Sequence, residues 1–336
     1  MGRYDCSNLN LLFPLLPWQE LWVHFHPQRS NRGLKPEFTW EMLIKAIIVQ
    51  WQVQITADID FANFFARHPE LVELCGMPRA PSHDVISKFT RKYGRNFPFL
   101  HRWFDAMLEE QGVFNDDDLA GDGTILPLHQ PYSKADQDCF GASSNSKKFY
   151  GLWLMLLVSV NTGIVRAFTI GKARIGQINL MFQLLTSAMI KPNCKIFLDG
   201  IFDTKDIHAA VLFDQECLPM ITYNAKGSQY KTRKQLSSDD WRGEYNPYFQ
   251  DIWMIFESSK RTSVERSNSD LKMNTVLSQF YERSRRLHKK STNHLTKVLI
   301  GSLVITQINA LVEIHKPKPI TLLNFVEQSS EQPAQA

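Results

Sequence analysis

The sequence predicts a mixed α/β protein in which a sheet covered by helices follows an all-helical N-terminal unit. Three observations support this fold class. Helical patterns without strand-like segments extend to about residue 114. Apolar and alternating runs of strand length begin at Leu119. From residue 177 onward, helical and strand patterns alternate, which is typical of a sheet with helices on its faces.

Length and composition agree with a globular protein. The 336 residues are enough for two or more domains, and contents of 43% hydrophobic and 21% charged residues are ordinary. Five cysteines without a CxxC pair favour neither a disulfide framework nor a zinc site and indicate a reducing cytoplasm. The most apolar run, residues 151–160, is too short to span a bilayer. No membrane anchoring is therefore expected.

The N-terminal unit is expected to span residues 1–114. Its first 36 residues form an irregular segment whose leucines pack onto a later helix. Four helical segments follow: one from residue 39 with apolar positions as far as residue 50, and others over about residues 59–66, 82–94 and 99–111. Lys88 and Arg91 lie on the exposed face of the third segment. A helix-turn-helix that contacts DNA and a small bundle with a solvated basic helix explain this face about equally well.

The second part, residues 115–315, is expected to form the sheet and its helices. Asp122 lies within the first strand, and Asp199 ends a later one. A hairpin is expected around Asn161-Thr162-Gly163. The expected strands cover residues 119–128, 152–160, 164–170, 195–199 and 219–223, and helices cover residues 177–189 and 204–213.

An insertion at about residues 225–258 interrupts this alternation with basic and aromatic residues. Lys231, Arg233 and Trp241 are typical of a segment that contacts backbone phosphates and unstacked bases. A solvated loop anchored by Trp241 is at least as good an interpretation of any single residue. After a helix that starts near residue 260 come a basic turn at residues 283–290, a long core helix over residues 292–314 and a polar tail over residues 316–336.

One narrow helix face carries a carboxylate between two cations. Arg261, Glu265 and Lys272 fall within roughly 40° of one another at helical spacing. An exposed Arg261–Glu265 salt bridge explains the pair by itself. However, residues 260–297 contain ten Lys or Arg against three acids, a balance of +7 in a chain whose total is +4. Positive charge is therefore concentrated around one carboxylate.

Asp122, Asp199 and Glu265 occupy positions from which they can converge. The sheet brings the two aspartates together, and a helix packed across it brings the glutamate. Three such carboxylates repel one another unless cations intervene, and hard oxygen ligands favour Mg²⁺ or Mn²⁺. Two ions about 3.5–4 Å apart would hold the attacking and leaving oxygens of a phosphoryl transfer. Arg261 and Lys272 would then hold phosphates.

The spacing Arg261-x3-Glu265-x6-Lys272, with Asp122 and Asp199 upstream, resembles the DDE transposases of bacterial insertion sequences that carry a Tyr-x2-Arg-x3-Glu-x6-Lys signature. Residues 39–111 look like the helical N-terminal domain of these proteins. Residues 285–290, which include Arg285, Arg286 and Lys289, are similar to their C-terminal pattern. Two positions depart from the family: Ser258 replaces its tyrosine, and Ile201 stands where relatives usually place glycine.

The resemblance implies a ribonuclease-H-like core with Asp122, Asp199 and Glu265 as ligands of divalent metal. It implies binding to terminal inverted repeats, hydrolysis that frees 3′-hydroxyls, and joining of these to target DNA, with Arg261 and Lys272 on phosphate near the cut end. Trp241 is the candidate for stacking on a flipped base. Binding of two ends implies a homodimer in the synaptic complex.

Two other functions remain open. The first is a catalytically silent, transposase-derived protein that binds DNA. The second is a ribonuclease-H-like nuclease that cuts strands without joining them and needs no paired complex of DNA ends.

Overall fold

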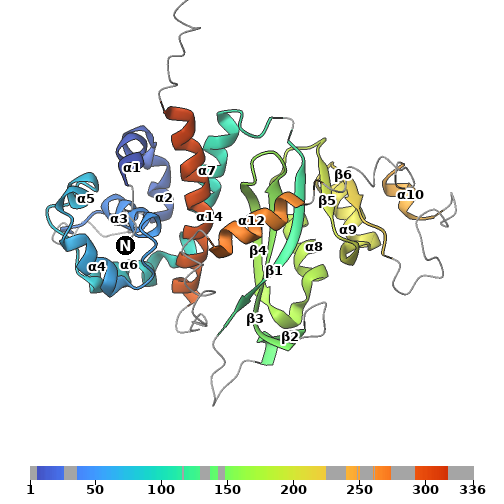
Figure 1. Ribbon diagram of the computed structural model, residues 1–336, viewed down its shortest axis with the longest axis horizontal. Helices are drawn as coiled ribbons and strands as arrows, with labels where there is room; N and C mark the ends of the chain where they lie inside the picture. The colour runs from blue at the N-terminus through green and yellow to red at the C-terminus, as the bar shows by residue number, and fades with distance from the viewer. Residues whose placement is uncertain are drawn as a thin grey trace, which may run out of the picture.

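The computed structural model describes residues 6–25, 36–115, 117–128, 137–142, 148–224, 240–247, 249, 260, 262–273 and 292–316. Within these ranges the chain forms a helical unit beside a mixed sheet with helices on its faces (Figure 1). This is a mixed α/β fold preceded by helices, and it confirms the fold class predicted from the sequence.

The helical unit begins earlier than the sequence pattern indicates. The segment expected to be irregular forms two short helices and two 3₁₀ turns, and its Leu9, Leu12 and Phe25 are buried. Pro14 and Pro17 keep each piece too short to show a helical period. The helices are α1 (Ser7–Leu12), α2 (Trp22–Phe25), α3 (Trp40–Gln52), α4 (Asp58–Ala66), α5 (Pro69–Leu74), α6 (His83–Tyr93) and α7 (Pro98–Glu110).

The helix α14 (Thr292–His315) completes the core of this unit, where it packs against α7, α1, α3 and α6. Gly301 permits its close approach to α3, because a Cβ there would lie 2.3 Å from the Trp51 ring. Among the described helices only α14, over Thr296–His315, is long and apolar enough to cross a membrane by length and composition. Because 67% of its most apolar stretch is buried inside the protein, we interpret α14 as a core helix.

A buried ion pair fixes α14 to α4. Lys297 is 1% exposed, and its Nζ lies 2.7 Å from Asp58 Oδ1. Ser87 and Gln50 also donate to the Asp58 carboxylate, at 2.7 and 3.2 Å. Burial alone would raise the pKa of Asp58, but the charge of Lys297 and these three hydrogen bonds hold that pKa below its usual value. The sequence places Lys297 in a basic cluster around Glu265, whereas the structure places it in the core.

The sheet contains all five expected strands and one more. β1 pairs antiparallel with β3 and parallel with β5, β4 pairs antiparallel with β3, and β5 pairs parallel with β6. The extra strand, β2, lies between the first two strands expected from the sequence. The strands are β1 (Leu119–Pro127), β2 (Phe140–Ala142), β3 (Lys148–Ser159), β4 (Val165–Lys172), β5 (Lys195–Leu198) and β6 (Leu218–Ile221).

Helices cover both faces of the sheet. On one face, α8 (Gln177–Ser187) and α9 (Lys205–Ala209) form an apolar core with β1, β3 and β5. On the other face, α12 (Thr262–Met273) crosses β1 and β3 and buries Val264 (Figure 1). The short helix α10 (Arg242–Tyr245) lies beside α9. Asp122 and Glu265 therefore belong to two elements in direct contact.

His101 links α7 to the sheet and makes stability dependent on pH. Its Nε2 lies 2.9 Å from the Val165 carbonyl oxygen, and burial is the main cause that lowers its pKa from 6.5 to about 4. The unfolded chain therefore binds a proton that the folded chain excludes. The contribution of His101 to the free energy of unfolding is fully present above about pH 6.5 and is lost as the pH falls toward 4. The total loss is about 3 kcal/mol.

The His101→Gln variant is expected to lack this component because glutamine has no proton to gain. Urea unfolding of both proteins at pH 7.5 and pH 5 measures it: the wild type should lose more stability than the variant between the two values. Asp105, whose pKa burial raises to about 6, is present in both proteins and cancels in the comparison. An equal loss in both proteins would contradict the prediction.

Candidate active site

Strand register brings Asp122 and Asp199 together. In the parallel pairing of β1 with β5, Gly121 lies opposite Leu198. Asp122 and Asp199 are the next residues along the chain after this last paired position, and neighbouring strands lie about 4.8 Å apart. Directly opposed residues of parallel strands point to the same side of the sheet, and here that side is the one crossed by α12. Both aspartates are partly exposed.

Asp199 lies where β5 turns into a short 3₁₀ helix, Gly200–Phe202. Its Oδ1 accepts a hydrogen bond of 2.7 Å from the Gly200 backbone N–H. A Cβ at Gly200 would lie 3.1 Å from the Thr222 carbonyl oxygen, so glycine here lets the turn pack against the end of β6. Ile201, which stands where relatives usually place glycine, lies in the middle of this 3₁₀ helix.

Helix α12 places Glu265 on the flank of a buried face. Val264, Ser267 and Asn268 are buried, while Glu265 is exposed in the first turn. Ser267 Oγ donates to the Gly163 carbonyl oxygen at 2.7 Å, which attaches α12 to the β3–β4 turn. Glu265 lies three residues before Asn268, and so about 4.5 Å from it along the helix axis.

Asn268 connects α12 directly to the first aspartate. Its Nδ2 lies 3.5 Å from Asp122 Oδ2, and the side chain is 7% exposed. Its buried Oδ1 has no hydrogen-bond partner among the described residues. A buried side-chain amide whose oxygen has no hydrogen-bond partner is unusual in a folded protein. Asn268 is not among the residues predicted from the sequence, where its signal is its position one helical turn after Glu265.

The three carboxylates are a donor set suited to a hard cation, but they are not equally close. The register places the two aspartates side by side, whereas Glu265 is displaced along α12. Across the described ranges, no three His, Cys, Asp or Glu side chains lie close enough together to hold a metal ion. The structure thus brings two of the three predicted ligands together and places the third on the adjoining helix.

The cations predicted to surround the site lie mostly outside the described residues. This applies to Arg261, to the side chain of Lys272, to Lys231 and Arg233, and to Arg285, Arg286 and Lys289. Ser258, at the family's tyrosine position, also lies outside the described residues. Lys260 is described: its Nζ lies 3.4 Å from Asp118 Oδ2 and 5.8 Å from the centre of the Phe197 ring. Lys260 therefore attaches the start of α12 to β1 and β5. Lys88 and Arg91 are exposed on α6, as predicted from the sequence.

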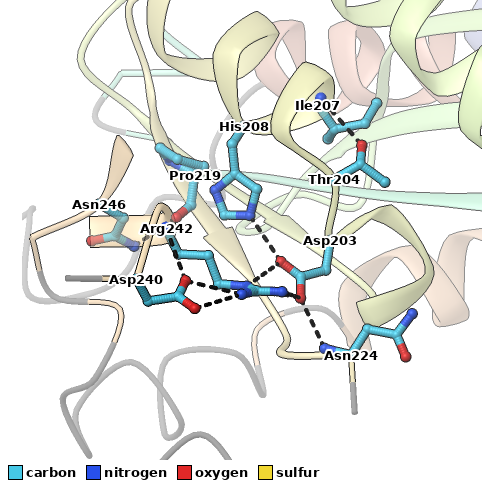
Figure 2. Close-up of polar contacts among 9 residues, drawn as sticks. All are labelled: Asp203, Thr204, Ile207, His208, Pro219, Asn224, Asp240, Arg242 and Asn246. Atoms are coloured by element: carbon cyan, nitrogen blue, oxygen red, sulfur yellow. Dashed lines mark hydrogen bonds and ion pairs between the residues drawn. The ribbon is translucent and has the colours of Figure 1, made fainter. Parts of the chain in front are cut away.

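Arg242 of the basic insertion is engaged within the protein. Its guanidinium forms a bidentate pair with Asp203, with distances of 2.9 and 2.8 Å, and also contacts Asp240 (Figure 2). His208 Nε2 lies 3.2 Å from the same Asp203 carboxylate, whose side chain is 1% exposed. Burial would raise the pKa of Asp203, but hydrogen bonds from His208, Arg242 and the Asn224 backbone hold it below its usual value. Arg242 is thus an anchor of the insertion.

Trp241 joins the same network. It meets the His208 ring edge-on at 5.1 Å and lies 4.4 Å from the Arg242 guanidinium. Asn246 fixes the other end of α10 through a 2.7 Å hydrogen bond to the Pro219 carbonyl oxygen of β6. These contacts match the interpretation of Trp241 as an anchor, and base stacking by Trp241 stays a prediction.

The fold and the carboxylate arrangement define a ribonuclease-H-like protein with a candidate metal-dependent site between β1, β5 and α12. Residues 114–300 match the family model described as the transposase DDE domain. Because the match covers more than half of the chain, the protein belongs to the DDE transposase family.

One solved structure with significant similarity is described as the cryo-EM structure of a piggyBac transposase synaptic complex with hairpin DNA. The two chains share 11% sequence identity with a TM-score of 0.38, over 100% of this chain and 87% of that one. The fold assignment here rests on strand order and pairing rather than on this likeness. No curated protein matches the chain significantly.

Proposed function

We propose that this DDE transposase binds the terminal inverted repeats of an insertion sequence, hydrolyses phosphodiester bonds at the ends and joins the freed 3′-hydroxyls to target DNA. The observation that carries the proposal is the register of β1 with β5, which sets Asp122 beside Asp199 on the face crossed by the Glu265 helix. In a member of this family, that is the arrangement expected of the catalytic carboxylates.

Asp122, Asp199 and Glu265 would hold Mg²⁺ or Mn²⁺, since three carboxylate donors suit a hard cation. When bound, two such ions activate the attacking oxygen and stabilise the leaving oxygen of an in-line displacement. Glu265 is exposed on the flank of α12, so its carboxylate is accessible to a DNA backbone approaching from solvent. Arg261 and Lys272 would neutralise flanking phosphates, Arg261 through a bidentate contact.

DNA contact is proposed to extend beyond the carboxylates. Lys88 and Arg91 present positive charge on the exposed side of α6, where Ile86 and Phe89 anchor the opposite side. Residues 283–290 add a second basic segment in the sequence. If several of these cations touch phosphates, affinity falls steeply with salt concentration. We also propose that the protein acts as a homodimer that holds two DNA ends, and that it does so in the cytoplasm of a bacterium.

Asn268 is expected to orient Asp122 for metal binding, because its amide is the group that α12 directs at this carboxylate. The Asn268→Ala variant should lose about 10- to 100-fold in the rate of metal-dependent cleavage, as is typical when a partner of a metal ligand is removed. The loss should shrink at high Mn²⁺ concentration. Ser269→Ala, at the exposed neighbouring position, is the matched control. Equal activity of both variants would remove Asn268 from the site.

The proposed function is tested with the full-length protein, Mg²⁺ or Mn²⁺, and labelled duplexes that carry the ends of the element flanking its coding region. Nicks that leave 3′-hydroxyls at the ends, followed by covalent transfer to a target plasmid, are the expected result. Cleavage without transfer, and without a requirement for paired ends, would indicate a nuclease. Binding without cleavage would indicate a catalytically silent DNA-binding protein.

A further inference from the structure

Two cysteines that are distant in sequence meet at one end of the sheet. In the parallel pairing of β5 with β6, Lys195 lies opposite Leu218, so the residues before them, Cys194 and Cys217, are neighbours. The Leu218 backbone N–H donates to the Cys194 carbonyl oxygen at 2.8 Å. The two Sγ atoms are 3.1 Å apart. This end of β5 is opposite the end that carries Asp199.

The two thiols share a hydrogen bond that changes their acidity. The S–H···S hydrogen bond with Cys194 is the main cause that lowers the pKa of Cys217. The same hydrogen bond, together with burial, raises the pKa of Cys194. Cys217, the buried sulfur of the pair, therefore loses its proton more readily than an isolated buried thiol, whereas Cys194 holds its proton more tightly. Cys75 is such a thiol, and burial raises its pKa to about 12. The thiolate is the reactive form of cysteine.

The geometry favours a disulfide over a metal site. Structural zinc needs four ligands, and no third His, Cys, Asp or Glu joins the two sulfurs in the part of the chain that the structure describes. Neighbouring strands place the Cα atoms of opposed residues about 5 Å apart, within the range that a disulfide spans. Cys194 is half-buried and accessible, whereas Cys217 is 2% exposed. An external reagent therefore reaches Cys194 first.

We propose that Cys194 and Cys217 form a modification site that a low-molecular-weight disulfide oxidises to an intramolecular disulfide. Cys194, the accessible thiol of the pair, loses its proton to water as its sulfur attacks one sulfur of the reagent, forms a mixed disulfide and releases one thiolate. Cys217 then loses its proton to water, and its sulfur attacks Cys194 Sγ, which expels the second thiolate. Two protein thiols are oxidised, and the reagent is reduced to two thiols. The bond joins the starts of β5 and β6 and leaves the carboxylate end of the sheet unmodified.

The test exposes the folded full-length protein to oxidised glutathione, blocks remaining thiols and digests the protein with trypsin without reduction. The expected product links the peptide of residues 175–195 to that of residues 206–226, at the summed mass less two hydrogen atoms, and it disappears on reduction. In the Cys217→Ser variant the reaction should stop at a glutathione adduct on Cys194. Cys75→Ser should still give the linked peptide.

Two results would overturn the proposal. One is recovery of Cys194 and Cys217 as separate blocked thiols from oxidised folded protein. The other is linked peptides that pair Cys194 equally with Cys6, Cys75 and Cys139, as expected from a protein oxidised in urea. Circular dichroism of each variant, recorded before oxidation, separates loss of the link from loss of the fold.

Discussion

Replacement of Glu265 by glutamine is expected to lower the rate of metal-dependent strand cleavage by about 1,000-fold or more, while DNA binding is largely retained. Glutamine keeps the size of the side chain but removes the negative charge that a hard cation requires. Because Glu265 is exposed in the first turn of α12, the substitution should change the free energy of unfolding by no more than about 0.5 kcal/mol. Single-turnover cleavage of a labelled end duplex and a gel-shift assay measure the two effects separately.

Glu110→Gln is the matched control for this prediction. Glu110 is also exposed on a helix, α7, and is not part of the proposed site. Asp122→Asn and Asp199→Asn should behave like Glu265→Gln, since the three groups are proposed to act as one unit. Normal cleavage by the Glu265 variant would show that the triad is wrongly assigned, whatever the fate of the two aspartates.

Replacement of Lys297 by alanine is expected to destabilise the protein by about 3–5 kcal/mol, the usual cost of leaving one member of a buried ion pair uncompensated. The Asp58 carboxylate would keep its hydrogen bonds from Ser87 and Gln50 but lose the cation 2.7 Å away. Urea unfolding followed by circular dichroism measures the change. Lys316→Ala, which breaks the exposed pair with Glu313, should cost at most about 1 kcal/mol.

A double-mutant cycle isolates the pair from the packing of the lysine side chain. Lys297→Met combined with Asp58→Asn removes both charges and retains most of the volume. The double variant should lose less stability than the sum of the two single variants. Additive losses would show that Lys297 acts through its methylene groups and that the charge contributes nothing.

Periodicity predicted the sheet, because apolar runs of strand length and an Asn-Thr-Gly turn are local signals. Asp122 and Asp199 were placed on their strands for the same reason. Their closeness depends on the β1–β5 register, which involves residues about 77 apart in sequence and leaves no local signal. β2 was missed because a strand of three residues is too short to show alternation.

Charge was the least informative signal. Lys297 and Arg242 both contributed to basic segments, yet each is paired with an aspartate whose side chain is largely covered by the protein. Which cation faces solvent is decided by tertiary packing, and composition cannot report it. Asn268 was missed because a polar residue on a helix becomes notable only when its neighbours are known to be buried around it.

The placement of α14 bears on how the protein is made. A ribosome delivers the helices of the N-terminal unit first, but the helix that fills their core is encoded after the whole catalytic segment. Until residues 292–316 emerge, Trp51 lacks the helix against which it packs. Asp58 likewise lacks Lys297, its partner in the ion pair. The helical unit therefore cannot complete its core before the segment that carries the sheet has been synthesised. A nascent chain interrupted before this helix would carry every proposed metal ligand without a finished core.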